Sequence, residues 1–116
     1  MARDSIAVIA AALAGTELTG QTTIVPANGA TVPLGIDGKL ILVIAAGTGT
    51  GEHVDAVIKA GVRNNSGQGD LSVLVAEDKT VILGPFESER FEQADGSLHV
   101  DFTTGNVGTI AAIRLP

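Results

Sequence analysis

The chain has 116 residues and a formal net charge of −6, and it contains no cysteine. This length allows one domain with one modest core, and the lack of cysteine excludes disulfides and thiolate metal sites. The seven lysine and arginine residues are scattered singly, so the sequence offers no basic patch that would neutralise phosphates. We therefore expect no binding to nucleic acid or to an anionic membrane.

Aliphatic side chains must build the core of this domain. Hydrophobic residues make up 45% of the chain but aromatic residues only 3%, with no Trp and no Tyr. Aliphatic side chains bury less area than aromatic rings do, so such a core buries less apolar area per side chain. We expect the protein to draw part of its stability from neighbouring copies, as a homo-oligomer held by apolar strand faces.

The first third of the chain, residues 1–36, gives mixed signals. Residues 5–13 fit a short helix with a polar residue at its start and Gly15 at its end, or equally a first strand. This apolar run is too short to span a bilayer and lacks the basic start of a signal peptide, so we interpret it as part of the fold. Residues 26–33 begin and end with a proline, which indicates an edge strand or a loop. We assign residues 1–36 to an N-terminal arm or edge segment.

Residues 37–116 show the pattern of short strands. Turn residues such as Asp37-Gly38 and Gly84-Pro85 separate segments in which apolar residues alternate or run continuously. Residues 54–60 also fit a helix, but their neighbours favour a strand. The expected strands are residues 39–46, 54–60, 71–76, 80–83, 98–103 and 107–115. They predict a single all-β domain, a β-sandwich or a jelly-roll-like barrel, with residues 37–116 as its core.

A glycine-rich loop, Gly47-Thr48-Gly49-Thr50-Gly51, follows the first of these strands. It resembles a dinucleotide-binding loop if a helix comes next. That fingerprint needs a third glycine where this chain has Glu52, and an acidic residue ending a second strand, whereas Asp70 begins one. The phosphate-loop pattern also fails, because no lysine follows the loop. The better interpretation is a flexible loop between two strands, and we expect no cofactor.

Histidines are scarce, and neither His53 nor His99 lies in a zinc-binding motif. His99 and Asp101 occupy alternate positions and so share one face of an expected strand. With Ser97 beside them they would form a hydrolytic trio. Because the apolar residues of this strand alternate with them, we interpret the three as part of a solvated polar face.

Carboxylates cluster around two phenylalanines near residues 86–95. The residues concerned are Glu87, Glu89, Glu92 and Asp95, together with Arg90, Phe86 and Phe91. Paired carboxylates can act in acid–base catalysis or bind a cation, but a calcium loop needs alternating ligands before a glycine, and only Asp95-Gly96 fits. We interpret the segment as a solvated acidic loop anchored by two buried rings. No nucleophile, base and orienting group occur together, so we expect no catalytic or metal site and no enzyme.

Four motifs occur in a fixed order in the second half of the chain. They are Gly84-Pro85-Phe86, Arg90-Phe91, Asp95-Gly96-Ser97-Leu98-His99-Val100 and Ile110-Ala111-Ala112-Ile113-Arg114-Leu115. In this order they resemble a family of small proteins encoded beside the major capsid gene of tailed bacteriophages and prophages. The resemblance covers about residues 37–116 and is best over the last third.

The resemblance implies a virion structural protein, namely a head decoration (cementing) protein on the outer surface of the assembled capsid. Its partners would be the major capsid protein and further copies of itself, as a trimer. It would be synthesised in the cytoplasm of the bacterial host. The N-terminal third, which lacks the strand pattern of the rest, would be the capsid-facing arm.

Two other roles stay open at this point. The protein could be a tail or head–tail connector component, which would form sixfold or twelvefold rings instead of threefold clusters. It could also be a carbohydrate-binding or adhesin module displayed on the virion. Sugar sites usually stack sugars on exposed aromatic rings, and this chain has no Trp or Tyr.

Overall fold

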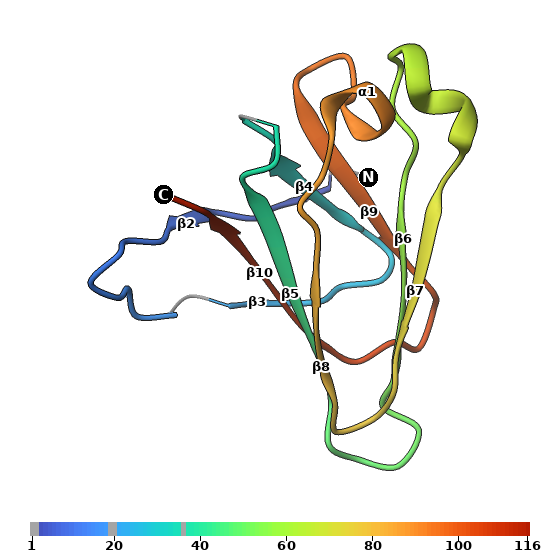
Figure 1. Cartoon of the computed structure of the whole chain (residues 1–116). Helices are drawn as coiled ribbons and strands as arrows, with labels where there is room; N and C mark the ends of the chain where they lie inside the picture. The colour runs from blue at the N-terminus through green and yellow to red at the C-terminus, as the bar shows by residue number, and fades with distance from the viewer. Residues whose placement is uncertain (1–2, 19–20, 36) are drawn as a thin grey trace.

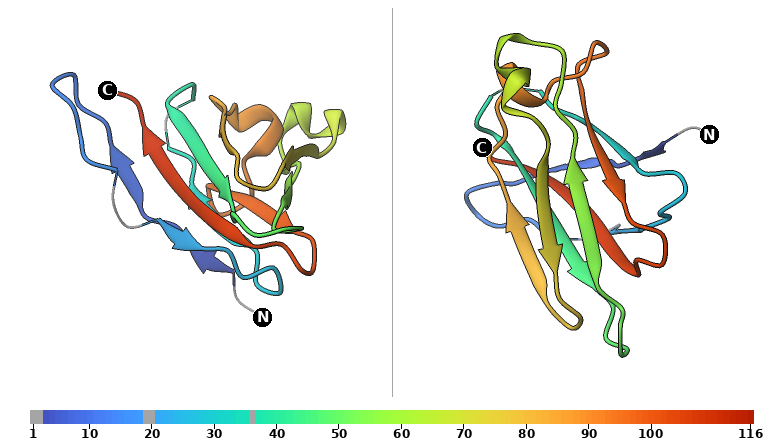
Figure 2. Two further views of the ribbon diagram at one scale, coloured as in Figure 1. Left: turned by 90° about the horizontal axis from the view of Figure 1, so that it is seen from below. Right: turned by 90° about the vertical axis from the view of Figure 1, so that its right-hand side faces the viewer.

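Two β sheets packed face to face make up the structure, a computed structural model that describes residues 3–18, 21–35 and 37–116 (Figures 1 and 2). Sheet A has the strand order β1 (Asp4–Ser5), β4 (Ala30–Pro33), β9 (Ser97–Phe102), β6 (Val54–Ile58) and β7 (Leu71–Val75). Sheet B has the order β2 (Val8–Ala10), β10 (Gly108–Arg114), β5 (Leu40–Ala46) and β8 (Thr80–Leu83), and β3 (Thr22–Thr23) also pairs with β10. The predicted all-β sandwich is confirmed.

The core lies between the sheets, because alternate side chains of each strand point to the same side. The aliphatic residues that are at most 1% exposed are Ala30, Val32, Val54, Ala56, Ile58, Val75, Leu98 and Val100 in sheet A, and Leu40, Leu42, Ile44, Ile110 and Ala112 in sheet B. Burial of each Leu, Ile or Val contributes about 1.5–3 kcal/mol. The alternation predicted for the strand of His99 and Asp101 is therefore correct, since Leu98, Val100 and Phe102 are its buried hydrophobic residues.

The described part of residues 1–36 is built into both sheets. β1 lies at the edge of sheet A and runs parallel to β4, while β2 lies at the edge of sheet B and runs parallel to β10. Between them, Ile6 is buried in the shared core. The helix that residues 5–13 also fit is not formed, and the strand alternative is correct for two short pieces.

The proline-bracketed stretch becomes a turn followed by β4. This strand is not an edge strand over its whole length, because Ala30 and Thr31 pair with β1 on one side and with β9 on the other. Pro33 lies past the end of β1, and the next amide, that of Leu34, donates to the Gly96 carbonyl. The Pro33 nitrogen faces the side of β4 on which no strand lies at this position. Its missing N–H therefore costs the sheet no hydrogen bond.

Two short helical turns, which the sequence did not predict, lie together at one end of the sandwich (Figure 1). η1 (Asn64–Gln68) is a 3-10 turn between β6 and β7, where the sequence predicted only a turn. α1 (Ser88–Phe91) is a single turn between β8 and β9, inside the expected acidic loop. Only Phe91 of these two elements is buried, so the turns are held by that one anchor and by polar contacts.

Ile6 tests whether the N-terminal segment belongs to the core. Replacing Ile6 by Ala should lower the free energy of unfolding by about 2–5 kcal/mol, because a buried side chain is removed and a cavity is left. Leu13→Ala is the control, since Leu13 is 100% exposed. Urea denaturation followed by circular dichroism measures both. Equal stability of the two variants would show that the segment does not contribute to the core.

Candidate functional site

The glycine-rich loop joins two strands, since residues 54–58 form strand β6 and not a helix. The Gly49 amide donates to Glu52 Oε1 at 3.2 Å, and the Gly51 amide donates to Glu77 Oε1 at 3.4 Å. A phosphate-binding loop keeps such amides free for an anion at a helix N-terminus. Here carboxylates of the chain itself take them, so the second interpretation, a loop between strands, is correct.

Ser97 and Asp101, two of the three residues that would form a hydrolytic trio, have other partners. The Ser97 hydroxyl donates to Asp95 Oδ1 at 2.5 Å, and Asp101 Oδ1 forms an ion pair with Arg3 at 2.6 Å. A nucleophile would need its hydrogen bond to the histidine instead. His53 lies apart, between the Gly51 carbonyl and Asp55. Within residues 3–18, 21–35 and 37–116, no group of three or more His, Asp or Glu side chains could hold a metal ion.

His99 lies on the outer face of sheet A, among charged neighbours. Burial, and then the positive charge of Arg3, lowers its pKa below the ordinary value of 6.5, and the carboxylates of Asp95 and Asp101 oppose this less strongly. Arg3 is held in place because its guanidinium also donates to the Val100 carbonyl at 3.0 Å. The polar outer face predicted for this strand is therefore present, and its histidine favours the neutral form.

This histidine should make stability depend on pH. The unfolded chain binds the His99 proton more readily than the folded chain does, so the contribution is present above about pH 6.5 and is lost as the pH falls through the lowered folded-state pKa. His99→Gln should lose less stability than the wild type between about pH 7.5 and about pH 5. Urea titrations of both proteins at the two pH values measure this. An identical loss in both proteins would contradict the assignment.

Two phenylalanines anchor the acidic loop, as the sequence predicts. Phe86 and Phe91 are both buried, and their rings meet edge to face with centroids 5.5 Å apart. The Arg90 guanidinium lies over the Phe91 ring at 4.8 Å from its centroid, and its Nε donates to the Gly69 carbonyl at 3.2 Å. The aromatic pair thus fixes α1 to the core, and Arg90 ties α1 to the end of η1.

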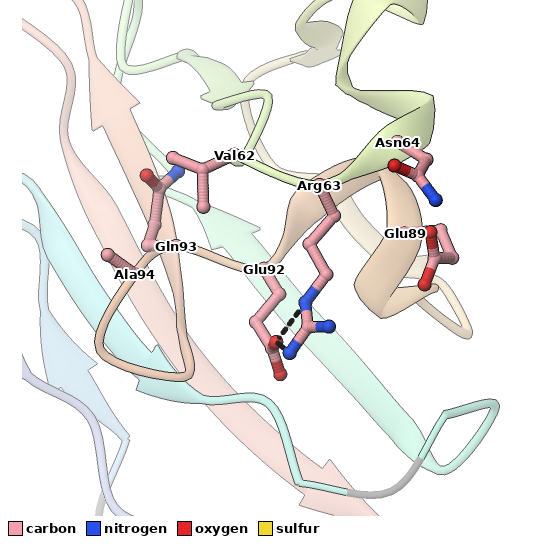
Figure 3. Close-up of a pocket in the computed structure, with 7 residues that line it drawn as sticks. All are labelled: Val62, Arg63, Asn64, Glu89, Glu92, Gln93 and Ala94. Atoms are coloured by element: carbon pink, nitrogen blue, oxygen red, sulfur yellow. Dashed lines mark hydrogen bonds and ion pairs between the residues drawn. The ribbon is translucent and has the colours of Figure 1, made fainter.

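A polar hollow of about 360 Å³ opens between α1 and the chain before η1. Figure 3 shows its lining residues, with the Arg63 side chain reaching across to Glu92. Arg63 Nε donates to Glu92 Oε1 at 2.6 Å, and the Gln93 amide donates to the Ala60 carbonyl at 3.0 Å. These polar groups satisfy one another and hold the two turns together. They do not form a nucleophile, a base and an orienting group around a reacting position.

The two aromatic anchors can be tested against the charges around them. Phe91→Ala should lower the free energy of unfolding by about 3–5 kcal/mol, because it removes a buried ring from a packed pair. Glu87→Ala should change it by at most about 0.5 kcal/mol, because Glu87 is an exposed residue. Thermal denaturation followed by circular dichroism compares them. Equal melting temperatures would mean that the inside and outside of this segment are reversed.

The outer faces of the two sheets differ in character. Sheet A carries charged pairs on its outer side, among them Arg3 with Asp101 and Lys59 with Asp70 at 2.8 Å. Sheet B instead presents what we name the apolar face. Its residues are Ile9, Ile41, Val43, Ala45, Ile82, Ala111 and Ile113, with Thr23, Thr80 and Thr109 at one end. A signal for this face exists in the sequence, because residues 40–46 are apolar on both sides of the strand.

A second surface feature, the β2–β3 loop, projects from the edge of sheet B (Figure 1). Its described part, residues 11–18, folds into a tight turn: the Gly15 amide donates to the Ala12 carbonyl at 2.9 Å, and Gly15 has φ +104°. The Thr16 hydroxyl closes its base, accepting from the Ala12 amide at 3.0 Å and donating to the Ala10 carbonyl at 3.3 Å. The turn holds Leu13 at its tip, where its side chain is fully exposed.

Comparisons with known proteins give no relative for this chain. No protein-family model, curated protein or solved structure matches it. Among the described residues, no helix is long and apolar enough to cross a membrane. Function must therefore be argued from the surface of the molecule itself.

Proposed function

We propose that this protein decorates the head of a tailed bacteriophage, where it binds the assembled major capsid protein from outside and stabilises the shell. Two lines of support meet in this proposal. The first is the resemblance that the motifs of residues 84–115 carry. The second, which carries the proposal, is the β2–β3 loop, a structured protrusion with one large apolar side chain at its tip.

The motifs themselves serve the fold. Phe86 and Phe91 anchor α1, residues 95–97 form the turn into β9, and residues 110–114 belong to β10 in the middle of sheet B. Residues of this kind specify an architecture, and binding must come from other positions on the surface. This separation fits a protein whose sandwich is attached to a lattice through exposed segments outside these motifs.

The β2–β3 loop is the part best suited to contact a capsid. Residues 3–10 belong to the strands and the core, so the capsid-facing arm expected from the N-terminal third is narrowed to residues 11–18. An exposed apolar tip of this kind can fill a pocket on a partner, as central interface residues do. One such contact is weak, but several linked copies on a repeating shell bind at high effective concentration.

Leu13→Ser tests this role. The variant should lose most of its binding to undecorated heads in co-sedimentation, because each contact would forgo about 1.5–3 kcal/mol of apolar burial. Leu74→Ser is the matched control, a leucine that is 66% exposed in the middle of edge strand β7. Circular dichroism of both variants should match that of the wild type, since neither side chain lies in the core.

Three outcomes would change the assignment. If Leu13→Ser sediments with heads as the wild type does, the loop is not the contact. If the wild-type protein ignores heads altogether, the decoration role is wrong. If labelled protein is found on tails or at the portal vertex, in sixfold or twelvefold rings, the protein is a tail or connector component instead.

A further inference from the structure

The apolar face of sheet B extends across the four neighbouring strands β2, β10, β5 and β8. In the parallel and antiparallel registers, Ile113 lies between Ile9 and Ile41, and Val43 lies between Ala111 and Ile82. Opposite residues of paired strands share one side of the sheet, so these side chains form two adjoining apolar rows. Ile82, on the edge strand β8, is 72% exposed.

Such a face is unusual for the outside of a sandwich. Antiparallel sheets that face water normally alternate apolar and polar side chains, whereas β5 is apolar on both sides and β10 adds Ala111 and Ile113 to the outer side. Most side chains of this face are half-buried, Ala111 is buried, and Ile82 is exposed. A contiguous apolar patch on an outer surface marks an interaction surface or an aggregation risk. Among the described residues, none of the side chains that form the face is charged.

We infer that the apolar face of sheet B is a self-association surface, which packs against the same face of a second copy of this chain. The inference goes beyond the proposed capsid role and stands whether or not the protein binds a head. Two identical faces meet around a twofold axis, in which each residue set contacts its own counterpart. Sheets stacked in this way lie about 10 Å apart, as in a sandwich core.

Charge favours a second copy over a partner of different chemistry. The chain carries a net charge of −6, so two copies repel except where their surfaces are uncharged. The apolar face is such a surface, whereas the outer face of sheet A holds charged groups such as Asp101 and Lys59. A partner recognised by charge would find nothing to pair with on the apolar face, but an identical copy matches it.

The area of the face allows a weak dimer. β5 and β10 have 7 residues each, β8 has 4 and β2 has 3, so at about 3.4 Å per residue and about 4.8 Å between strands the face covers about 340 Å². Two copies would therefore bury about 690 Å² in plan, below the roughly 1,000 Å² from which specific interfaces start. Side-chain relief adds to this plan area. We expect association in the micromolar range, visible only when concentration is varied.

Ile82→Lys and Leu74→Lys form a matched pair for sedimentation velocity on the full chain. Both add one positive charge to an exposed apolar position in an edge strand, one on each sheet. We expect the wild type and Leu74→Lys to shift from monomer to dimer as concentration rises. Ile82→Lys should raise the dissociation constant by at least about tenfold, because it places a charge at a dry contact.

Thiol labelling gives a second readout that does not depend on the charge at the edge. The chain has no cysteine, so Val43→Cys and Val57→Cys each introduce a single thiol, at central positions on the outer sides of sheets B and A. Both valines are half-buried, and the substitutions are conservative in size. Maleimide should label the Val43→Cys variant several-fold more slowly at high protein concentration, and the Val57→Cys variant at an unchanged rate.

The outcomes separate cleanly. A wild-type monomer at all concentrations, with no protection of position 43, overturns the inference and leaves another partner, such as the capsid, to cover the face. An oligomer that Ile82→Lys leaves intact and in which position 43 stays reactive also overturns it. A trimer in which Ile82→Lys removes the protection of the thiol at position 43 supports the self-association surface. In that case only the twofold arrangement is replaced, by a threefold one.

Discussion

Aliphatic packing between the two sheets is the interaction that holds this protein together. The chain has no cysteine and only three phenylalanines, so neither a cross-link nor a large aromatic core is available. Each of the strands β4 to β10 therefore contributes inward side chains, and the core also recruits the segments at the start of the chain through Ile6 and Ile24. The two rings of Phe86 and Phe91 close one end, where α1 would otherwise have no apolar anchor.

The two outer faces differ, because that of sheet A is charged and that of sheet B is apolar. Sheet A can face water because pairs such as Arg3 with Asp101 satisfy its charges, and burial beside Arg3 holds the pKa of His99 below its ordinary range. Among the residues that the structure describes, no ion pair lies on the outer side of sheet B. Its central strand β10 is flanked by lanes of Ile, Val and Ala, which water solvates poorly. A lean domain with one apolar face is suited to assembly.

Binding and self-association would then use different parts of the molecule. The β2–β3 loop presents a single apolar tip on a turn that Gly15 and Thr16 hold, while the apolar face is broad and flat. A tip fits a pocket of an unlike partner, and a flat face fits its own copy. Neither feature needs the polar hollow beside α1, whose Arg63 and Glu92 serve to join two turns.

The sequence by itself determined the strands, because period-two alternation and turn residues act locally: β5, β8 and β9 lie within about two residues of their predicted bounds. It also determined the buried pair of phenylalanines. Only the tertiary structure decided that residues 5–13 split between two sheets, that Ser97 hydrogen-bonds to Asp95, and that α1 forms at all. It alone decided which apolar side of β5 and β10 stays uncovered, because alternation defines two sides of a strand but not which of them meets the other sheet.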